Sequence, residues 1–139
     1  MAFSGTYRGI RFRSLLELSL VRQLEDEGLV LGSTMLYEAT RVPYGKTRKR
    51  TYVVDLTLPQ TRTLVEVKPS SRVSGRRNVE KRRAAEAWCL ENEWTYVIVT
   101  EREIRECGRL LTLKEASIIP GISWDGKAKR KIGRSKRRT

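Results

Sequence analysis

Two β-rich runs joined by a short polar turn constrain this chain more than any other part of its sequence. Residues 51–58 read TYVVDLTL and residues 62–68 read RTLVEVK, with PQT between them. Runs of this composition and length, separated by turn residues, predict a β-hairpin. The hairpin should bury its apolar side chains, yet it also carries Asp55, Glu66 and Lys68. Charges beside a core need a metal, a partner or a chemical role, so these residues are the first candidates for a functional site.

The spacing of the three charged residues predicts a specific chemistry. Side chains alternate along a strand, so Glu66 and Lys68 share one face of the sheet. A tight turn brings Asp55, on the partner strand, within reach of Glu66. Two carboxylates with carbonyl oxygens and water suit Mg²⁺ or Mn²⁺, which can polarise a phosphate and lower the pKa of bound water. Lys68 could stabilise the charged phosphate or help to activate the water.

The other elements are predicted from hydrophobic spacing and turn residues. Residues 14–28 carry an apolar stripe at helical spacing, with Ser14 as N-cap and Gly28 as C-cap. Residues 34–44 predict a strand that becomes irregular at Pro43. The remaining elements are a helix over 79–93, a strand over 94–100, and a last helix opened by a capping box of Thr100 and Glu103. The predicted order is α-β-β-β-α-β-α.

Charge and composition limit the partners and the metals. The chain has 139 residues, enough for one domain, and a net charge of +13, which favours nucleic acid or another polyanion as partner. It has no histidine and only two isolated cysteines, so zinc sites and histidine triads are excluded and any metal must be bound by oxygen. No apolar run is long enough for a membrane span, and no signal peptide is recognisable, so no membrane partner is expected.

Much of the excess charge lies in the last fourteen residues. Residues 126–139, GKAKRKIGRSKRRT, contain eight Lys or Arg and no acid. Mutual repulsion and few apolar residues predict a disordered basic tail after a domain over residues 1–125. Two roles for the tail stay open, namely added affinity for DNA and docking to an acidic partner or a packaged genome.

The pattern Asp55…Glu66-Val67-Lys68 resembles the active-site motif of the PD-(D/E)XK nucleases. Val54 stands where the family name has proline. The segments FRSLLE (12–17), VVDLTL (53–58), LVEVKP (64–69) and NVEKRRAAEAWCLENEWTYVIVTEREI (78–104) are similar to phage head-completion nucleases, TnsA-type transposon end-cutting endonucleases and endonuclease I-type junction resolvases. The likeness covers roughly residues 7–105.

The resemblance implies a restriction-endonuclease-like α/β fold, with an α-β-β-β-α-β core and a central mixed sheet flanked by helices. It also implies an active site of Glu17, Asp55, Glu66 and Lys68, with Asp55, Glu66 and Glu17 as the metal ligands. Two non-functional interpretations of these residues remain at this point. The hairpin charges could be exposed strand residues, and Glu17 could be a solvent-facing capping residue three positions after Ser14.

Basic residues near the candidate site are the predicted DNA contacts. They lie before the first helix, in the turn before the Asp55 strand, in the loop after Lys68 and on the next helix: Arg8, Arg11, Arg13, Lys46, Arg48, Lys49, Arg50, Arg72, Arg76, Arg77 and Lys81.

The leading hypothesis is a phage-encoded, Mg²⁺-dependent DNA endonuclease that selects DNA structure or ends rather than sequence, in junction resolution or head completion. Its expected location is the host cytoplasm or the virion. Besides DNA, a second copy of the chain and a phage portal or other virion protein remain open as partners. The alternatives are a non-catalytic DNA-binding or virion structural protein on a nuclease fold and, with less support, an RNA-binding protein.

Overall fold

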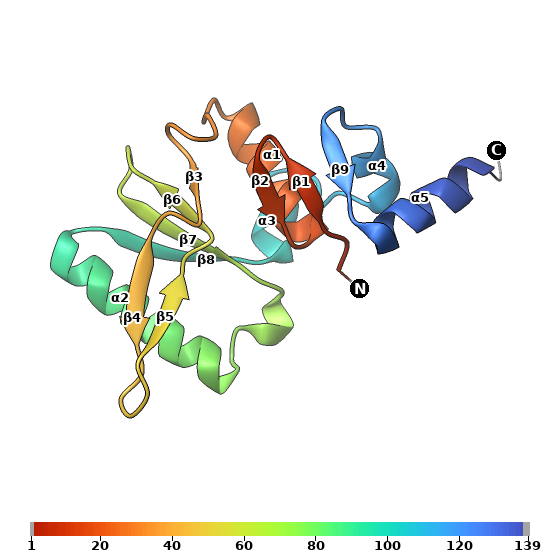
Figure 1. Ribbon diagram of the computed structural model, residues 1–139. Helices are drawn as coiled ribbons and strands as arrows, with labels where there is room; N and C mark the ends of the chain where they lie inside the picture. Colours follow the sequence, from red (N-terminus) through yellow and green to blue (C-terminus); the bar gives the residue numbers. More distant parts are fainter. Residues whose placement is uncertain (1, 138–139) are drawn as a thin grey trace.

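A four-stranded mixed sheet forms the centre of the fold (Figure 1). The computed structural model describes residues 2–137, with side chains through residue 134. The sheet contains β3 (Leu36–Tyr37), β6 (Leu56–Leu58), β7 (Thr63–Val67) and β8 (Thr95–Val99), in that spatial order. The first two pairings are antiparallel, and β7 runs parallel to β8. The sheet is therefore mixed, as the resemblance implied.

Helices cover both faces of this sheet. α2 (Arg76–Asn92) packs on one face through Ala85 and Cys89, which belong to the same buried cluster as Leu64 of β7. α1 (Leu15–Asp26) and α3 (Glu101–Cys107) pack on the other face. The order α1-β3-β6-β7-α2-β8 is the predicted α-β-β-β-α-β core, so the predicted α/β fold class is confirmed.

Local signals placed the starts of α1 and α3 correctly, whereas α2 begins at Arg76, three residues before the predicted start at residue 79. The Ser14 side chain accepts a hydrogen bond from the Glu17 amide, 3.3 Å away, and caps α1. Thr100 and Glu103 form the predicted capping box of α3. That helix ends at Cys107, before Gly108, and the chain then forms the short helix α4 (Leu113–Ser117). Within the described residues, no helix combines the length and the apolar character that a membrane span requires.

Two predicted strands are each divided in the structure. Residues 34–44 form β3 and then β4 (Arg41–Tyr44), and residues 51–58 form β5 (Arg50–Val53) and then β6. β4 and β5 pair only with each other, so Pro43 is tolerated inside β4 because a two-stranded ribbon has open edges. The chain leaves this ribbon at Val54 and Asp55 and joins the central sheet at β6. Asp55 therefore sits at a bend between two sheets.

Three short strands form a third sheet from distant parts of the chain. β1 (Gly5–Tyr7) pairs with β2 (Ile10–Phe12) on one side and with β9 (Ile122–Trp124) on the other, both antiparallel. The edge of Trp124 packs against the Phe12 ring, with centroids 5.5 Å apart. The sequence predicted no strand before the first helix, where it indicated only basic residues.

The expected disordered tail is largely helical. Residues Gly126–Arg137 form α5, which projects from the third sheet (Figure 1). Its base is docked on the protein, since Ala128 is only 1% exposed. The Lys129 amide donates to the Asp125 carbonyl over 2.9 Å, which begins the helical hydrogen bonding. Burial of this first turn stabilises the start of the helix, which repulsion between the basic side chains would otherwise disfavour. Residues 138–139, also assigned to the tail, lie outside the described residues.

Candidate active site

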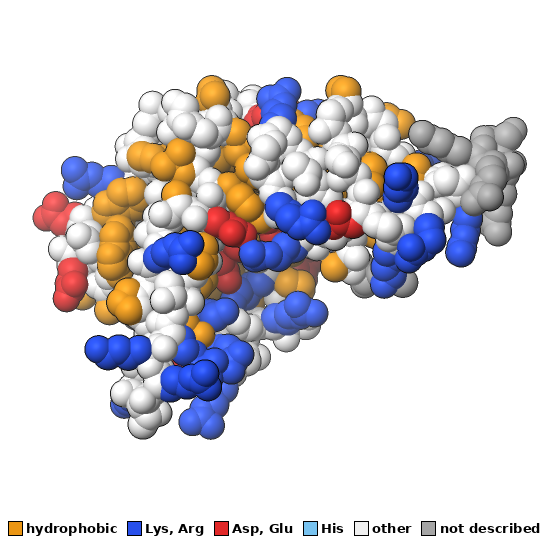
Figure 2. Space-filling view, viewed as in Figure 1, with side chains coloured by type: hydrophobic (Ala, Val, Ile, Leu, Met, Phe, Trp, Pro, Cys, Tyr) orange, Lys and Arg blue, Asp and Glu red, His pale blue; other side chains and the backbone are white. Residues whose placement is uncertain are grey.

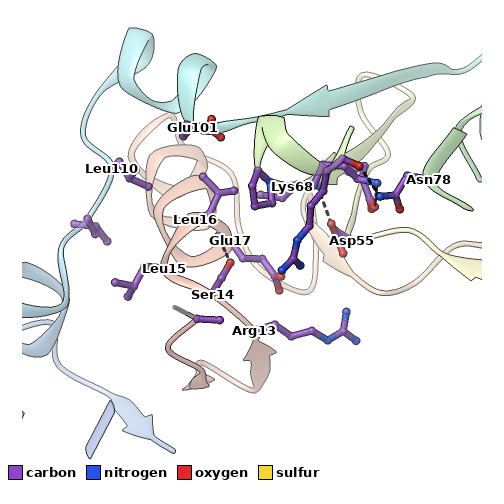
Figure 3. A pocket seen from close by; sticks show the side chains of 16 residues that line it. Arg13, Ser14, Leu15, Leu16, Glu17, Asp55, Lys68, Asn78, Glu101 and Leu110 are labelled. Atoms are coloured by element: carbon purple, nitrogen blue, oxygen red, sulfur yellow. Dashed lines mark hydrogen bonds and ion pairs between the residues drawn. The ribbon is translucent and has the colours of Figure 1, made fainter. Parts of the chain in front are cut away.

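A cleft of about 710 Å³ lies between the start of α1 and the ends of β7 and α3. It is lined by charged, polar and apolar side chains: Arg13, Glu17, Asp55, Glu66, Lys68, Arg72, Asn78 and Glu101, with Leu15, Leu16, Leu110 and Leu111 on its apolar wall. Figure 3 shows side chains from α1, from the bend before β6 and from the segment after β7 around this opening. All four residues predicted to be catalytic line this one cleft.

The hairpin register brings Asp55 and Glu66 together. Leu56 pairs with Val65, so the next positions along the two strands are Asp55 and Glu66. Both side chains are buried, with residue exposures of 7% and 8%. The Val67 amide donates to Oδ2 of Asp55 over 2.8 Å, which fixes that carboxylate against β7. The alternative of exposed strand charges is therefore wrong.

Lys68 supplies the only cation paired with these carboxylates within the described part of the chain. Its Nζ lies 3.2 Å from Oε2 of Glu66, and both side chains are about 10% exposed. Its amide donates to the Val99 carbonyl over 3.1 Å, which continues the β7–β8 pairing past the end of β7. The backbone thus holds Lys68 at the cleft while its side chain offsets part of the carboxylate charge.

The carboxylate pair has the chemistry of an incomplete cation site. Oε1 of Glu66 is buried and has no hydrogen-bond partner among the described residues. A buried charged oxygen without a partner is costly, and a bound cation would satisfy it. Over residues 2–137, no three acidic, histidine or cysteine side chains form a ready-made metal cluster. Mg²⁺ tolerates this because it keeps several waters and commonly takes only one or two protein carboxylates. The residues present therefore fit such an ion.

Burial and the charge of Glu66 raise the pKa of Asp55 to about 9. Without a cation, the folded protein then keeps a proton on Asp55 at neutral pH, whereas the unfolded chain ionises near 3.8. The folded state binds more protons between these two values. The contribution of Asp55 to stability is thus fully present below the unfolded pKa and is lost as the pH rises through the folded pKa.

Asp55→Asn is expected to stabilise the metal-free protein, and more strongly at high pH. Asparagine is neutral at every pH, and its oxygen can still accept from the Val67 amide. We expect the advantage over wild type to grow by roughly 4–5 kcal/mol between about pH 5 and about pH 8.5, measured by urea unfolding in EDTA. The exposed Glu106→Gln is the control. A variant less stable than wild type at the higher pH would contradict the assigned protonation.

Glu17 faces the cleft from α1. It is 5% exposed, and its Oε1 lies 2.7 Å from the Tyr37 hydroxyl, so the alternative of a solvent-facing capping residue is wrong. Burial raises the pKa of Glu17, and its charge contributes to the raised pKa of Asp55. Figure 3 places Glu17, Asp55 and Arg13 around the same opening. Glu17 lines the same cleft as Asp55 and Glu66 without forming a three-carboxylate cluster with them.

The predicted DNA contacts fall into three groups. Arg13 and Arg72 line the cleft itself. Arg8 and Arg11 do not line it and are paired with acids, Arg8 with Glu25 at 2.7 Å and Arg11 with Asp125 at 2.8 Å. The others lie on the β4–β5 hairpin (Lys46, Arg48, Lys49 and Arg50) and on the first turns of α2 (Arg76, Arg77 and Lys81). Figure 2 shows basic side chains gathered over this end of the molecule, beside the acidic groups at its centre.

Sequence reasoning missed three residues that shape the cleft. Asn78 lines it, and its Nδ2 donates to the Arg72 carbonyl over 2.5 Å. Tyr37 contacts Glu17, and Glu101 accepts a 3.0 Å hydrogen bond from the Ser70 amide, two residues after Lys68. Asn78 and Glu101 each lie at the start of a helix that follows an active-site segment. This position in the sequence could have identified both as residues near the cleft. Tyr37 had none, since its contact spans twenty positions.

The comparisons with known proteins bear on residues 27–101. A family model for the TnsA-like endonuclease N-terminal region matches this segment, which is just over half of the chain. The match includes Asp55, Glu66 and Lys68, and it begins at residue 27, after Glu17. Searches of the curated proteins and of the solved structures gave no match. The family match supports the endonuclease part of the resemblance drawn from the sequence and does not extend to its phage-specific part.

Proposed function

The chain belongs to the TnsA-like endonuclease N-terminal family, and from this premise we propose that it is a metal-dependent DNA endonuclease with its active site in the cleft. The observation that carries the proposal is the buried group of Asp55, Glu66 and Lys68 within the matched segment. Two buried carboxylates weaken binding to a polyanion unless a cation offsets them. A fold that served only to bind DNA would have no use for them.

Asp55 and Glu66 would hold Mg²⁺ or Mn²⁺, and Glu17, which lines the same cleft, would orient a bound water. Held there, such an ion would supply a positive charge that polarises the phosphodiester and lowers the pKa of a bound water. Lys68 places a positive charge beside Glu66, where it stabilises the negative charge that develops on the phosphate. Arg13, Arg72 and Asn78 at the cleft wall would hold the neighbouring phosphates.

We further propose that the enzyme selects DNA ends or structure rather than sequence. The basic residues around the cleft suit phosphates, and phosphate contacts position DNA without reading its bases. Cutting at transposon ends, trimming at a phage portal and resolution of junctions all remain within this proposal. Resolution would additionally need two coordinated nicks and therefore a second copy of the chain.

A substrate panel tests this function. End-labelled four-way junction, linear duplex and single strand are incubated with the protein in Mg²⁺, in Mn²⁺ and in EDTA. We expect cleavage in either metal and none in EDTA. Asp55→Asn is the matched inactive variant because it should keep the fold. Paired nicks on opposing arms would identify a resolvase, and cuts near free ends would identify an end-processing enzyme.

Two results would count against the proposal. Equal cleavage by wild type and Asp55→Asn would point to a contaminating nuclease. Absence of cleavage on every substrate, with DNA binding intact in EDTA, would favour the non-catalytic DNA-binding alternative.

A further inference from the structure

The C-terminal helix α5 is held firmly against the body of the protein. It follows β9 directly, and β9 is hydrogen-bonded to β1. Ala128 is buried on the body, and Nζ of Lys131 lies 5.4 Å from the centre of the Phe3 ring. Asp125, at the root of the helix, accepts from Ser4 and Arg11. The base of the helix is therefore docked beside β9 and α4.

The exposed side of α5 carries unneutralised positive charge. Apart from Lys131, which lies over the Phe3 ring, four basic side chains are exposed along it: Lys127, Lys129, Arg130 and Arg134. None of these four forms an ion pair within the described part of the chain, whereas Arg8, Arg11 and Arg13 are each paired with an acid. The described part of the helix contains no acid of its own. A fixed row of like charges is self-repelling, and a linear polyanion would relieve that repulsion.

The helix suits duplex DNA better than an anionic membrane. Binding in a membrane interface requires an exposed apolar face. Ala128 and Ile132 are the apolar residues of α5, and Ala128 is buried while Ile132 is half-buried. Little apolar surface is left to insert. Twelve residues at 1.5 Å per residue make the helix about 18 Å long, which matches about five base pairs of the phosphate backbone.

The position of α5 relative to the cleft would allow one duplex to contact both. Basic residues of the β4–β5 hairpin and of α2 lie at one end of the molecule, and those of α5 lie at the other, with the acidic groups between them (Figures 1 and 2). The ion pair of Arg11 with Asp125 joins the root of α5 to β2, and β2 leads directly to Arg13 at the cleft. A duplex with its scissile phosphate in the cleft can extend over α5.

We propose that α5 is a rigid second DNA-binding arm, which holds the phosphate backbone of the duplex that flanks the cleavage site. The proposal rests on the proposed nuclease function for the position of the cut. It assigns a binding role to residues that lie outside the cleft and outside the segment that matches the family.

A charge-neutral variant tests the arm. Lys127, Lys129, Arg130 and Arg134 are changed together to glutamine, which leaves Ala128, Lys131 and Ile132 in place. The matched control changes four other exposed basic residues, namely Arg62, Arg102, Arg105 and Lys114, none of which lines the cleft. Far-ultraviolet circular dichroism and thermal unfolding verify that both variants keep the fold.

Binding to labelled duplexes is measured in EDTA by fluorescence anisotropy over a salt series. For a duplex of about 30 base pairs, we expect the α5 variant to bind at least about tenfold more weakly than wild type, with the salt slope smaller by about three. A duplex of about 10 base pairs, too short to reach from the cleft over the arm, should show a much smaller loss. The control variant should stay close to wild type on both.

Three outcomes would overturn the arm. They are unchanged affinity of the α5 variant, an equal loss in the control variant, and tighter α5-dependent binding to phosphatidylserine vesicles than to duplex. Because binding is measured without metal, the two proposals can fail separately. A protein that binds duplex through α5 but cuts nothing in Mg²⁺ supports the arm and contradicts the nuclease. A protein that cuts DNA but shows no α5-dependent binding supports the nuclease and contradicts the arm.

Discussion

Glu66→Gln is expected to reduce metal-dependent cleavage by about a thousandfold or more, because removing a metal ligand forfeits several kcal/mol of transition-state stabilisation. Oε1 of Glu66 is buried and has no partner among the residues that the structure describes, and the other oxygen of Glu66 already contacts Lys68. Glutamine keeps the size of the side chain and removes its charge. The change should therefore act on the cation site and leave the packing of β7 largely intact.

Two readouts separate loss of the metal from loss of the fold. Calorimetric titration with Mn²⁺ in the absence of DNA should show weaker binding for Glu66→Gln than for wild type. Thermal unfolding in EDTA should show a variant that remains folded. Glu80→Gln, an exposed carboxylate on α2, is the control and should cleave like wild type. Near-normal cleavage or Mn²⁺ affinity in Glu66→Gln would remove Glu66 from the metal site.

Lys68→Met is expected to impair both stability and cleavage, but through a different route. Removing one partner of a buried ion pair leaves the other charge uncompensated, which typically costs about 3–5 kcal/mol. The metal-free variant should unfold at lower urea at about pH 8, and added Mn²⁺ should restore part of the loss. Cleavage should fall by about a hundredfold or more, because the charge that stabilises the phosphate is gone.

The direction of the change in Mn²⁺ affinity distinguishes the charge-neutralising role of Lys68 from the metal-ligand role of Glu66. Lys68 neutralises Glu66, so its removal should leave Mn²⁺ binding unchanged or make it tighter, opposite to Glu66→Gln. Lys114→Met, at an exposed position on α4, is the control. Weaker Mn²⁺ binding in Lys68→Met, or cleavage at the wild-type rate, would show that Lys68 does not act as proposed.

The pairing of Asp55 with Glu66 could be predicted because it depends on local rules. Alternation along the strands and a short turn fix the register once the hairpin is recognised. Caps at Ser14 and Thr100 were predictable for the same reason, since each bonds within three residues. The α-β-β-β-α-β order followed from runs long enough to show their period.

Features set by distant contacts could not be predicted in this way. The run TYVVDLTL has β propensity throughout. It is divided near Asp55 only because its first part pairs with β4 and its last part pairs with β7. Strands β1 and β9 have three residues each and depend on one another. Residues 126–137 look disordered by charge alone, and they become a helix because one small residue, Ala128, meets a complementary surface.

The pairing of β1 with β9 also bears on how the protein reaches its native state. The Ser4–Asp125 contact beside these strands joins residues 121 positions apart, so closing this sheet requires one of the largest loops that the chain can form. Such non-local closure is slow because chain entropy is lost before the contacts are gained. The β6–β7 hairpin with Asp55 and Glu66 needs only neighbouring residues. We therefore expect the carboxylate pair to form early in folding, while the wall of the cleft that carries Arg13 is completed late, when the last strand docks.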